Sequence, residues 1–386
     1  MKILFLSFYF KPDLCAGSFR NTALVNSLKK RKEVKHIDVI TTMPNRYKSY
    51  VQNPPKIEIT RKVTINRYEI GSHNSGMFDQ SKSFFNFAYH TFQHIDDKKY
   101  DLIYASSSRL MTGFLGALIS KKLKTPIYLD IRDIFTEILL ELLPKPISFL
   151  LHFPLKIIEK FTINQAKKVN IVSGGFKNYF DKNFNKTKIS NFPNGIDNEF
   201  IKELKQKKIY SSNRIILYAG NIGEGQGLEK ILPEFAIKLK DWNFRVIGDG
   251  GTLHKLQKEV NKIGMKNIKI LPPISRKKLI EEYLRSDILF LHLNHYKSFE
   301  KVLPSKIFEY AATGKPILAG VRGFPNYFIK KNIENASCFE PCNLKEAIRC
   351  FAKLKLKTVR RDKFIKKYSR KNQMELLAHD VISSIK

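Results

Sequence analysis

Short apolar runs rich in β-branched residues alternate with longer helical patterns along most of this chain, and this alternation restricts the fold more than any other feature. Lys2–Phe8, His36–Thr41 and Leu102–Ala105 have the pattern of buried strands, and Ser18–Lys30 and Arg109–Lys122 have that of helices. Strands that alternate with helices favour parallel sheets covered by helices on both faces. Two more strands are predicted in this half, Ile127–Asp130 and Lys168–Ser173. The second of them is predicted to be the last strand of the half.

The pattern stops at a turn cluster and then begins again. Phe192–Asp197 contains Pro-Asn-Gly, a strong boundary signal. Beyond it, strands are predicted at Arg214–Ala219, Phe244–Ile247, Ile268–Leu271, Ile288–Leu291 and Pro316–Ala319, with helices at Gly227–Leu239 and Leu253–Ile263. We therefore predict two doubly wound α/β domains, with ligands at the carboxyl ends of the strands in a cleft between them. The predicted limits are 1–192 and 193–365, with 366–386 as a C-terminal helix that packs back on the first domain.

Glycine-rich loops follow several of the predicted strands. Tyr218–Leu228 and Val246–Gly251 both end a strand and precede a helix in the second half, and Phe8–Phe19 does so in the first half. Glycines allow a backbone to surround an anion closely, and a helix N-terminus favours phosphate. An ordinary strand-to-helix turn is the alternative, and it is the stronger interpretation for Phe8–Phe19 alone. The paired loops of the second half predict phosphate or nucleotide contact.

The segment Leu303–Ala319 carries the most informative polar residues. Pro304 and Ser305 suit a helix start, and Lys306 and Glu309 lie in the first two turns. Lys306 could hold a diphosphate together with the helix amides, which leaves Glu309 to accept hydrogen bonds from ribose hydroxyls. The alternative is a surface ion pair between Lys306 and Glu309.

Charged residues also gather at the end of a first-half strand, in Leu129–Asp133. Asp130, Arg132 and Asp133 there form either an internal ion-pair network or catalytic groups, and the position at a strand end favours the second interpretation. The histidines and cysteines show no metal-ligand spacing, so no metal site is expected.

The charge of the chain is strongly positive. Its 386 residues include 69 Lys or Arg against 35 Asp or Glu, a formal net charge of +34. Such a field attracts nucleic acid, anionic lipid or phosphorylated small molecules; lysines spread over solvated faces are an equally good interpretation. The cysteines fit reduced thiols in a cytoplasmic protein, and no apolar segment is long enough to span a membrane.

Taken in order, the motifs resemble glycosyltransferase family 4, the retaining GT-B enzymes, and especially the bacterial surface-polysaccharide branch that includes fucosamine transferases. The resemblance runs from Phe8 to Ala319, and its specificity lies in the ordered set of stretches: FYFKPDLCAGSFR, LDIRDIFTEIL, NIVSGGFKNYF, NFPNGID, YAGNIGEGQGLEKIL, VIGDGG, LPPISRKKL and PSKIFEYAATGKPIL.

This resemblance implies a GT-B fold, in which two Rossmann-like domains face each other, the first binding the acceptor and the second the nucleotide sugar. Glu309 matches the ribose-binding second glutamate of the family, and Arg132, Asp133 and Lys306 are the catalytic candidates. The donor-binding candidates are Gly17, Gly220, Asn221, Gln226, Gly248, Asp249, Gly250, Pro273, Ile274, Ser305, Lys306 and Glu309.

This sequence departs from the family pattern at several of these positions. Lys301 stands where the family has its first glutamate, with Glu300 beside it, and Asn221 and Gln226 replace the usual Arg and Lys of the phosphate clamp. Arg132 occupies the place of a common histidine. We interpret these changes as traits of a subfamily. They leave open a GT-B-like sugar epimerase or an inactive binding module, and a basic nucleic-acid-binding protein is a remote alternative.

The expected reaction is transfer of a sugar, an N-acetylated or deoxy amino sugar, from a UDP-linked donor to a lipid-linked glycan of O-antigen or capsule type. No cofactor or metal is expected, since preorganised electrostatics can stabilise the diphosphate leaving group. Two apolar segments, Phe84–Phe92 and Leu139–Ile158, could lie in an anionic membrane interface without spanning it, or else form buried core helices. The expected location is the cytoplasm, with peripheral contact to the inner face of the membrane; nucleic acid is not expected as a partner.

Overall fold

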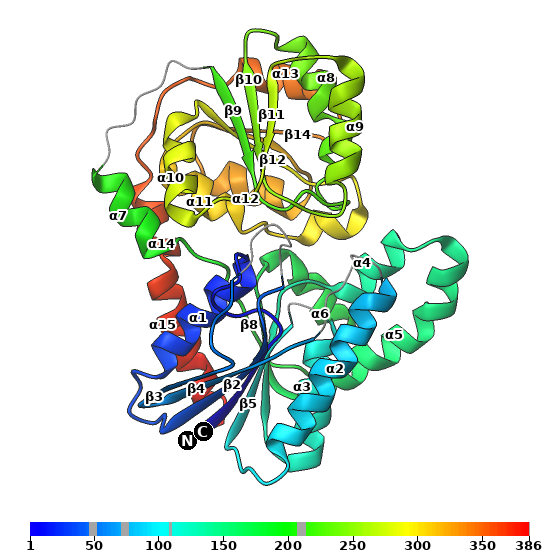
Figure 1. The fold of residues 1–386 in the computed structure, drawn as a ribbon, viewed down its shortest axis with the longest axis vertical. Helices are drawn as coiled ribbons and strands as arrows, with labels where there is room; N and C mark the ends of the chain where they lie inside the picture. The colour runs from blue at the N-terminus through cyan, green and yellow to red at the C-terminus, as the bar shows by residue number, and fades with distance from the viewer. Residues whose placement is uncertain (46–51, 71–76, 108–109, 207–213, 386) are drawn as a thin grey trace. The chain divides into compact units, whose positions relative to one another are not determined.

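The computed structural model describes residues 1–45, 52–70, 77–107, 110–206 and 214–385. It divides into two compact units, residues 1–194 with 370–386 and residues 195–369 (Figure 1). The chain therefore leaves the first unit after Asn194 and returns to it after Ser369, against predicted limits of 192 and 365. The second limit differs because α14 (Asp362–Tyr368) belongs to the second unit, where Phe364 and Tyr368 lie in the core.

The first unit is built on one mostly parallel sheet. Its described strands have the order β3-β4-β2-β1-β5-β6-β7-β8, in which only β3 is antiparallel to its neighbour. Their bounds are β1 Lys2–Ser7, β2 His36–Thr42, β3 Ile57–Thr60, β4 Val63–Tyr68, β5 Leu102–Ser107, β6 Ile127–Ile131, β7 Ala166–Ile171 and β8 Ile189–Ser190.

Helices cover both faces of this sheet. They are α1 Ala16–Leu28, α2 Met77–Ile95, α3 Leu110–Leu123, α4 Phe135–Leu142, α5 Lys145–Gln165, α6 Lys177–Asn183 and α15 Arg370–Ser383. The C-terminal helix α15 packs beside α1, and its Met374, Leu377 and Val381 are buried in the core under β1 and β2. The last residues of the chain thus complete the core of its first half.

The second unit has a fully parallel sheet of described strands, in the order β11-β10-β9-β12-β13-β14. The strands are β9 Ile215–Ala219, β10 Asn243–Ile247, β11 Ile268–Leu271, β12 Ile288–His292, β13 Ile317–Gly320 and β14 Ala336–Phe339. The α-helices are α7 Asn198–Gln206, α8 Leu232–Lys238, α9 Leu253–Ile263, α10 Arg276–Arg285, α11 Lys306–Thr313, α12 Phe324–Asn332, α13 Leu344–Ala352 and α14. The strand order reverses between β9 and β12, and such a switch point is where ligands bind in open parallel sheets.

The sequence prediction is wrong at a few elements. β3, β4, β8 and β14 were not predicted, so Lys168–Ser173 does not hold the last strand of the first half. The predicted helix Gly227–Leu239 is a 3₁₀ turn followed by α8, which begins at Leu232. Pro233 explains this start, because proline has no N–H to donate and is tolerated only in the first turn of a helix.

Asp38 on β2 is the centre of a buried polar cluster. Its carboxylate accepts hydrogen bonds from Tyr100 (2.6 Å), His94 (2.9 Å) and Asn66 (2.9 Å). Burial raises the pKa of Asp38, but the bonds from His94 and Tyr100 outweigh it and lower the pKa to about 2.

We expect this cluster to make stability depend on pH in acid. Because the pKa is lower in the folded than in the unfolded chain, the stabilisation is complete above about pH 4 and is lost as the pH falls toward 2. The Asp38→Asn variant should therefore unfold in urea with a free energy roughly 2 kcal/mol below wild type at pH 6, and the gap should narrow between pH 4 and pH 2.5. A gap that stays constant over this range would contradict the assignment.

Candidate functional site

The loops at the carboxyl ends of β9 and β10 and the start of α11 meet in the second unit. Lys306, the first residue of α11, extends its side chain to the end of β9, where its Nζ donates a hydrogen bond to the Tyr218 hydroxyl (2.8 Å). The ammonium also lies 4.3 Å from the centre of the Tyr218 ring. Tyr218 in turn donates to the carbonyl of Asn221 (2.5 Å), so the lysine is tied to the glycine-rich loop.

Gly220 is required by this approach. A Cβ at this position would lie 2.1 Å from Lys306 Cε and 2.4 Å from Nζ, and its φ of +143° is rarely adopted by other residues. Glycine is also required at position 248, since a Cβ there would lie 1.8 Å from the carbonyl oxygen of Gly220. The two glycines thus let the two loops and the lysine pack together.

Three glycine amides of the loops that the sequence offered for an anion already donate hydrogen bonds within the protein. Gly220 donates to Ile247 (2.8 Å), and Gly248 donates to Leu271 (3.0 Å). The Gly250 amide donates to the carboxylate of Asp249 (2.7 Å). The Gly220 and Gly248 amides are engaged because the loops continue the sheet hydrogen bonding for one more residue. Positive charge for an anion therefore comes from Lys306 rather than from these amides.

Asn221 and Gln226, at the predicted clamp positions, hold each other. Asn221 Nδ2 donates to Gln226 Oε1 (2.8 Å), which also accepts from the Gly223 amide (3.3 Å). They close the loop with neutral amide groups. Of the remaining candidates, Ser305 precedes α11, and half-buried Pro273 and Ile274 lie between β11 and α10.

Glu309, one turn along α11 from Lys306, contacts two residues of α10. Its Oε1 accepts from Arg276 Nη2 (2.8 Å) and its Oε2 from the Tyr283 hydroxyl (3.3 Å). The side chain is 13% exposed. The Tyr310 hydroxyl accepts from the amide of Ala219, which fastens α11 to the end of β9.

Tyr218 and Arg276 were missed by the sequence reasoning. Tyr218 sits inside an apolar strand run, where an aromatic residue is typical of the core, and it is 1% exposed. Arg276 is one of 69 Lys or Arg residues, and nothing in its spacing marks it. A signal for Tyr218 existed, because it is the first residue of the glycine-rich segment Tyr218–Leu228.

Of the charged residues at the end of β6 in the first unit, Asp130 belongs to the core and Arg132 remains a candidate for the site. Asp130 forms a fully buried ion pair with Arg20 (2.8 Å) and accepts from Asn170 (2.6 Å), which is the internal-network interpretation. Arg132 is half-buried, and its Nη1 is buried without a hydrogen bond to any described residue. Burial lowers the pKa of Arg132, with Asp130 opposing. Gly17 is buried in the first turn of α1.

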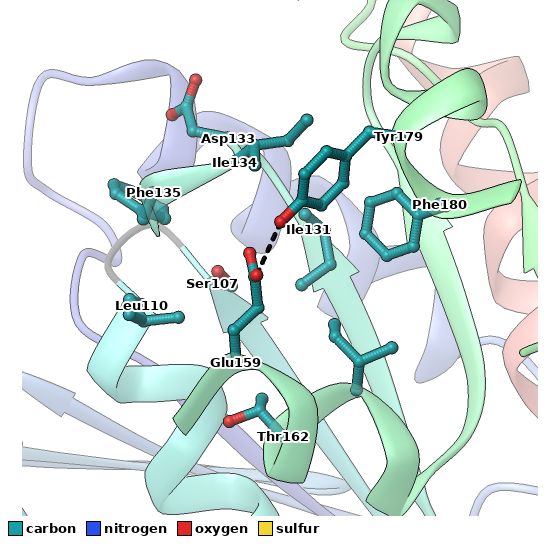
Figure 2. Close-up of a pocket in the computed structure, with 11 residues that line it drawn as sticks. Ser107, Leu110, Ile131, Asp133, Ile134, Phe135, Glu159, Thr162, Tyr179 and Phe180 are labelled. Carbon is teal, nitrogen blue, oxygen red and sulfur yellow. Dashed lines mark hydrogen bonds between the residues drawn. The ribbon is translucent and has the colours of Figure 1, made fainter. Parts of the chain in front are cut away.

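A small pocket lies beside Asp133 in the first unit (Figure 2). Burial raises the pKa of the Asp133 carboxyl to about 6, with Arg132 opposing, and the carboxylate points away from the hydrogen-bonded pair of Glu159 and Tyr179 (2.6 Å). The lining residues come from α3 to α6 and the ends of β5 and β6: Ser107, Leu110, Ile131, Asp133, Ile134, Phe135, Glu159, Thr162, Ile163, Tyr179 and Phe180.

Among the residues that the structure describes, no three His, Cys, Asp or Glu side chains gather closely enough to hold a metal ion. In the same residues, each helix is too short or too polar to cross a membrane.

Comparison with known sequences finds a family model that matches most of the second unit. Residues 199–371 match the family model described as Glycosyl transferases group 1. The Escherichia coli (strain K12) protein named "Putative colanic acid biosynthesis glycosyl transferase WcaI" is 30% identical over 132 residues, 34% of this chain. The match spans about a third (32%) of that relative's length.

Solved structures resemble the whole chain. Sucrose-phosphate synthase from Thermosynechococcus elongatus superposes with a TM-score of 0.77 at 12% identity, covering 100% of this chain and 98% of that one. Anabaena HepE, solved with UDP and glucose, gives 0.60 at 16% identity over 100% and 97%, and the lipopolysaccharide outer core galactosyltransferase WaaB gives 0.59 at 14% over 100% and 99%. These comparisons confirm the predicted family resemblance and the fold. Residues 199–371 of this chain match the glycosyl transferases group 1 family model, and the chain has the GT-B fold.

Proposed function

We propose that this chain is a retaining glycosyltransferase that moves a sugar from a nucleotide diphosphate to a lipid-linked glycan in bacterial surface-polysaccharide synthesis. The observation that carries the proposal is the Lys306 ammonium, held over Gly220 by the Tyr218 hydroxyl at the topological switch point of the second unit. A fixed cation at a strand end beside a helix N-terminus suits a diphosphate. The group 1 domain supports a sugar transferase over other users of diphosphates.

The donor in this proposal is UDP-linked. Anabaena HepE, a protein of the same fold, binds UDP and glucose in its crystal structure, and this supports the choice of nucleotide. Glu309 would accept hydrogen bonds from the ribose hydroxyls, and half-buried Pro273 and Ile274 would border the base. An N-acetylated or deoxy amino sugar remains the proposed cargo.

The proposed reaction is a front-face substitution without a metal or a covalent enzyme intermediate. The anomeric C–O bond to the β-phosphate breaks while the acceptor oxygen bonds to the same face of that carbon, and the acceptor proton passes to the departing phosphate oxygen. Lys306 stabilises the negative charge that develops on the diphosphate. Arg132 and Asp133 are proposed to position sugar or acceptor hydroxyls. The Nη1 of Arg132, which is buried and has no hydrogen bond to the residues that the structure describes, suits an incoming oxygen.

Product analysis tests this function. The purified chain should transfer label from UDP-N-acetylhexosamines to a lipid-linked glycan extract, with the anomeric configuration kept and with equal rates in EDTA. A changed sugar recovered on UDP in the absence of acceptor would instead show an epimerase. UDP binding with neither reaction across the donor panel would indicate a binding module.

Tyr218→Phe tests how Lys306 is held. The variant keeps the ring beneath the ammonium and removes only the hydroxyl that accepts from Lys306 and donates to Asn221. We expect UDP affinity to fall about threefold to tenfold, the effect of about one lost hydrogen bond. Isothermal titration measures this directly, and unchanged affinity would show that the hydroxyl does not position the lysine.

The lipid-linked acceptor is proposed because one helix of the first unit leaves an apolar face uncovered. On α5, Phe149 is 88% exposed, Phe153 72% and Ile157 52%, and their spacing of four places them on one side. Leu150 is exposed beside them, and exposed Lys145 and Lys160 flank the row. Apolar side chains between lysines match the surface of an anionic bilayer. The segment Phe84–Phe92 contributes less, because Phe84 and Phe87 are buried.

Vesicle binding tests the α5 surface. The chain should co-sediment with phosphatidylglycerol vesicles at low salt, and the variant Phe149→Ser, Leu150→Ser, Phe153→Ser should lose most of this binding while keeping UDP affinity. A control is Ile57→Ser with Ile59→Ser, which removes two exposed apolar side chains from β3 of the same unit. If the control loses binding equally, or wild type ignores the vesicles, the membrane proposal fails.

A further inference from the structure

One guanidinium in the second unit joins two carboxylates that come from distant parts of the chain. Arg276 Nη2 donates to Glu309 on α11 (2.8 Å) and to Asp197, which precedes α7. The three side chains are 13% to 16% exposed, and the guanidinium lies 4.7 Å from the centre of the Phe200 ring. Contacts on both its edge and its face thus fix the plane of Arg276.

Asp197 lies where the chain enters the second unit. The unit begins at Gly195, and the amide of Ile196 donates to the carbonyl of Tyr368 (2.8 Å), next to the point where the chain leaves at Ser369. The Tyr368 ring also packs against Phe308, the neighbour of Glu309, with centroids 5.3 Å apart. Both connecting segments are therefore attached to the α11 turn that carries Glu309.

We propose that Arg276, anchored by Asp197, is a positioning residue that orients Glu309 toward the ribose of the nucleotide, an inference that rests on the proposed function. A carboxylate can accept about four hydrogen bonds. Arg276 and Tyr283 occupy one position on each oxygen of Glu309, so each oxygen keeps capacity for one ribose hydroxyl. A carboxylate held at both oxygens cannot rotate, which lowers the entropic cost of binding two neighbouring hydroxyls.

The test is a double-mutant cycle read out by UDP titration. Arg276→Ala and Glu309→Gln should each weaken UDP binding at least about tenfold, the scale of a charge-assisted hydrogen bond. If Arg276 acts through Glu309, the double variant should bind no more weakly than Glu309→Gln alone. Arg276→Lys should restore part of the affinity, because lysine keeps the charge but not the planar fork.

Arg245→Ala is the control, since Arg245 forms an ion pair with Glu282 of α10 (2.5 Å) in the same unit, with side chains 30% and 15% exposed. Its UDP affinity should equal that of wild type. Additive losses in the double variant, or an equal loss in the control, would overturn the positioning role while the donor site stands. Wild type that binds no UDP would overturn the proposed function, and this inference with it.

Discussion

Replacing Lys306 by alanine should lower kcat/KM for the donor by about 100-fold or more, the loss seen when one preorganised charge stabiliser is removed from an active site. The residue supplies the fixed positive charge beside the loop at the end of β9, where the amides of Gly220 and Gly248 are already used within the sheet. Initial rates over a range of UDP-sugar concentrations measure the effect. The thermal midpoint should change little, because lysine contributes few contacts to the core.

Lys331→Ala provides the control for this experiment. Lys331 makes the same kind of contact in the same unit, donating to the Tyr327 hydroxyl (2.9 Å) with its ammonium 5.3 Å from the ring centre, but on the exposed face of α12. The Lys331→Ala variant should have the same kcat/KM for the donor as wild type. Similar losses in both variants would mean that net charge, not the position of Lys306, governs activity.

Breaking the Arg20–Asp130 pair should destabilise the first unit by about 3–5 kcal/mol, because removal of one partner leaves a buried charge without its counter-ion. Both side chains are 0% exposed, and Arg20 also donates to the carbonyls of Phe192 and Pro193. Arg20→Ala should show this loss in urea unfolding followed by circular dichroism. The double variant Arg20→Met, Asp130→Leu should recover part of it, since no charge is then left buried.

The exposed ion pair Lys177–Asp181 (2.6 Å) on α6 is the comparison. The Lys177→Ala variant should lower the free energy of unfolding by no more than about 0.5 kcal/mol. This experiment also separates structure from catalysis within one motif. If Arg20→Ala were as stable as wild type, Asp130 would have to be regarded as a site residue, not as part of the core.

Apolar periodicity was enough to predict several elements of the second unit. β11 and α9 have the predicted bounds, and β9 differs from its prediction by one residue. β3 and β8 were missed for a physical reason: β3 is an exposed edge strand of four residues and β8 has only two, so neither carries a buried run. Short edge strands depend on their partners more than on their own sequence.

The site was predicted in part. Lys306 and Glu309 could be found because a helix start and a spacing of three are local features of the sequence. The contacts that hold them, Tyr218 on β9 and Arg276 on α10, come from residues 88 and 33 positions away along the chain, which no local pattern records. Two amides of the predicted cradle, those of Gly220 and Gly248, are already used because sheet hydrogen bonding continues into both loops.

Calorimetric titration of UDP and UMP against wild type and Lys306→Ala shows whether Lys306 holds the diphosphate. If Lys306 holds the diphosphate, wild type should bind UDP at least about tenfold more tightly than UMP, since the added phosphate gains a charge-assisted contact. In the alanine variant this preference should largely disappear while UMP affinity stays the same. Equal affinities of wild type for UDP and UMP, or a preference for UDP that survives the substitution, would show that Lys306 does not hold the diphosphate.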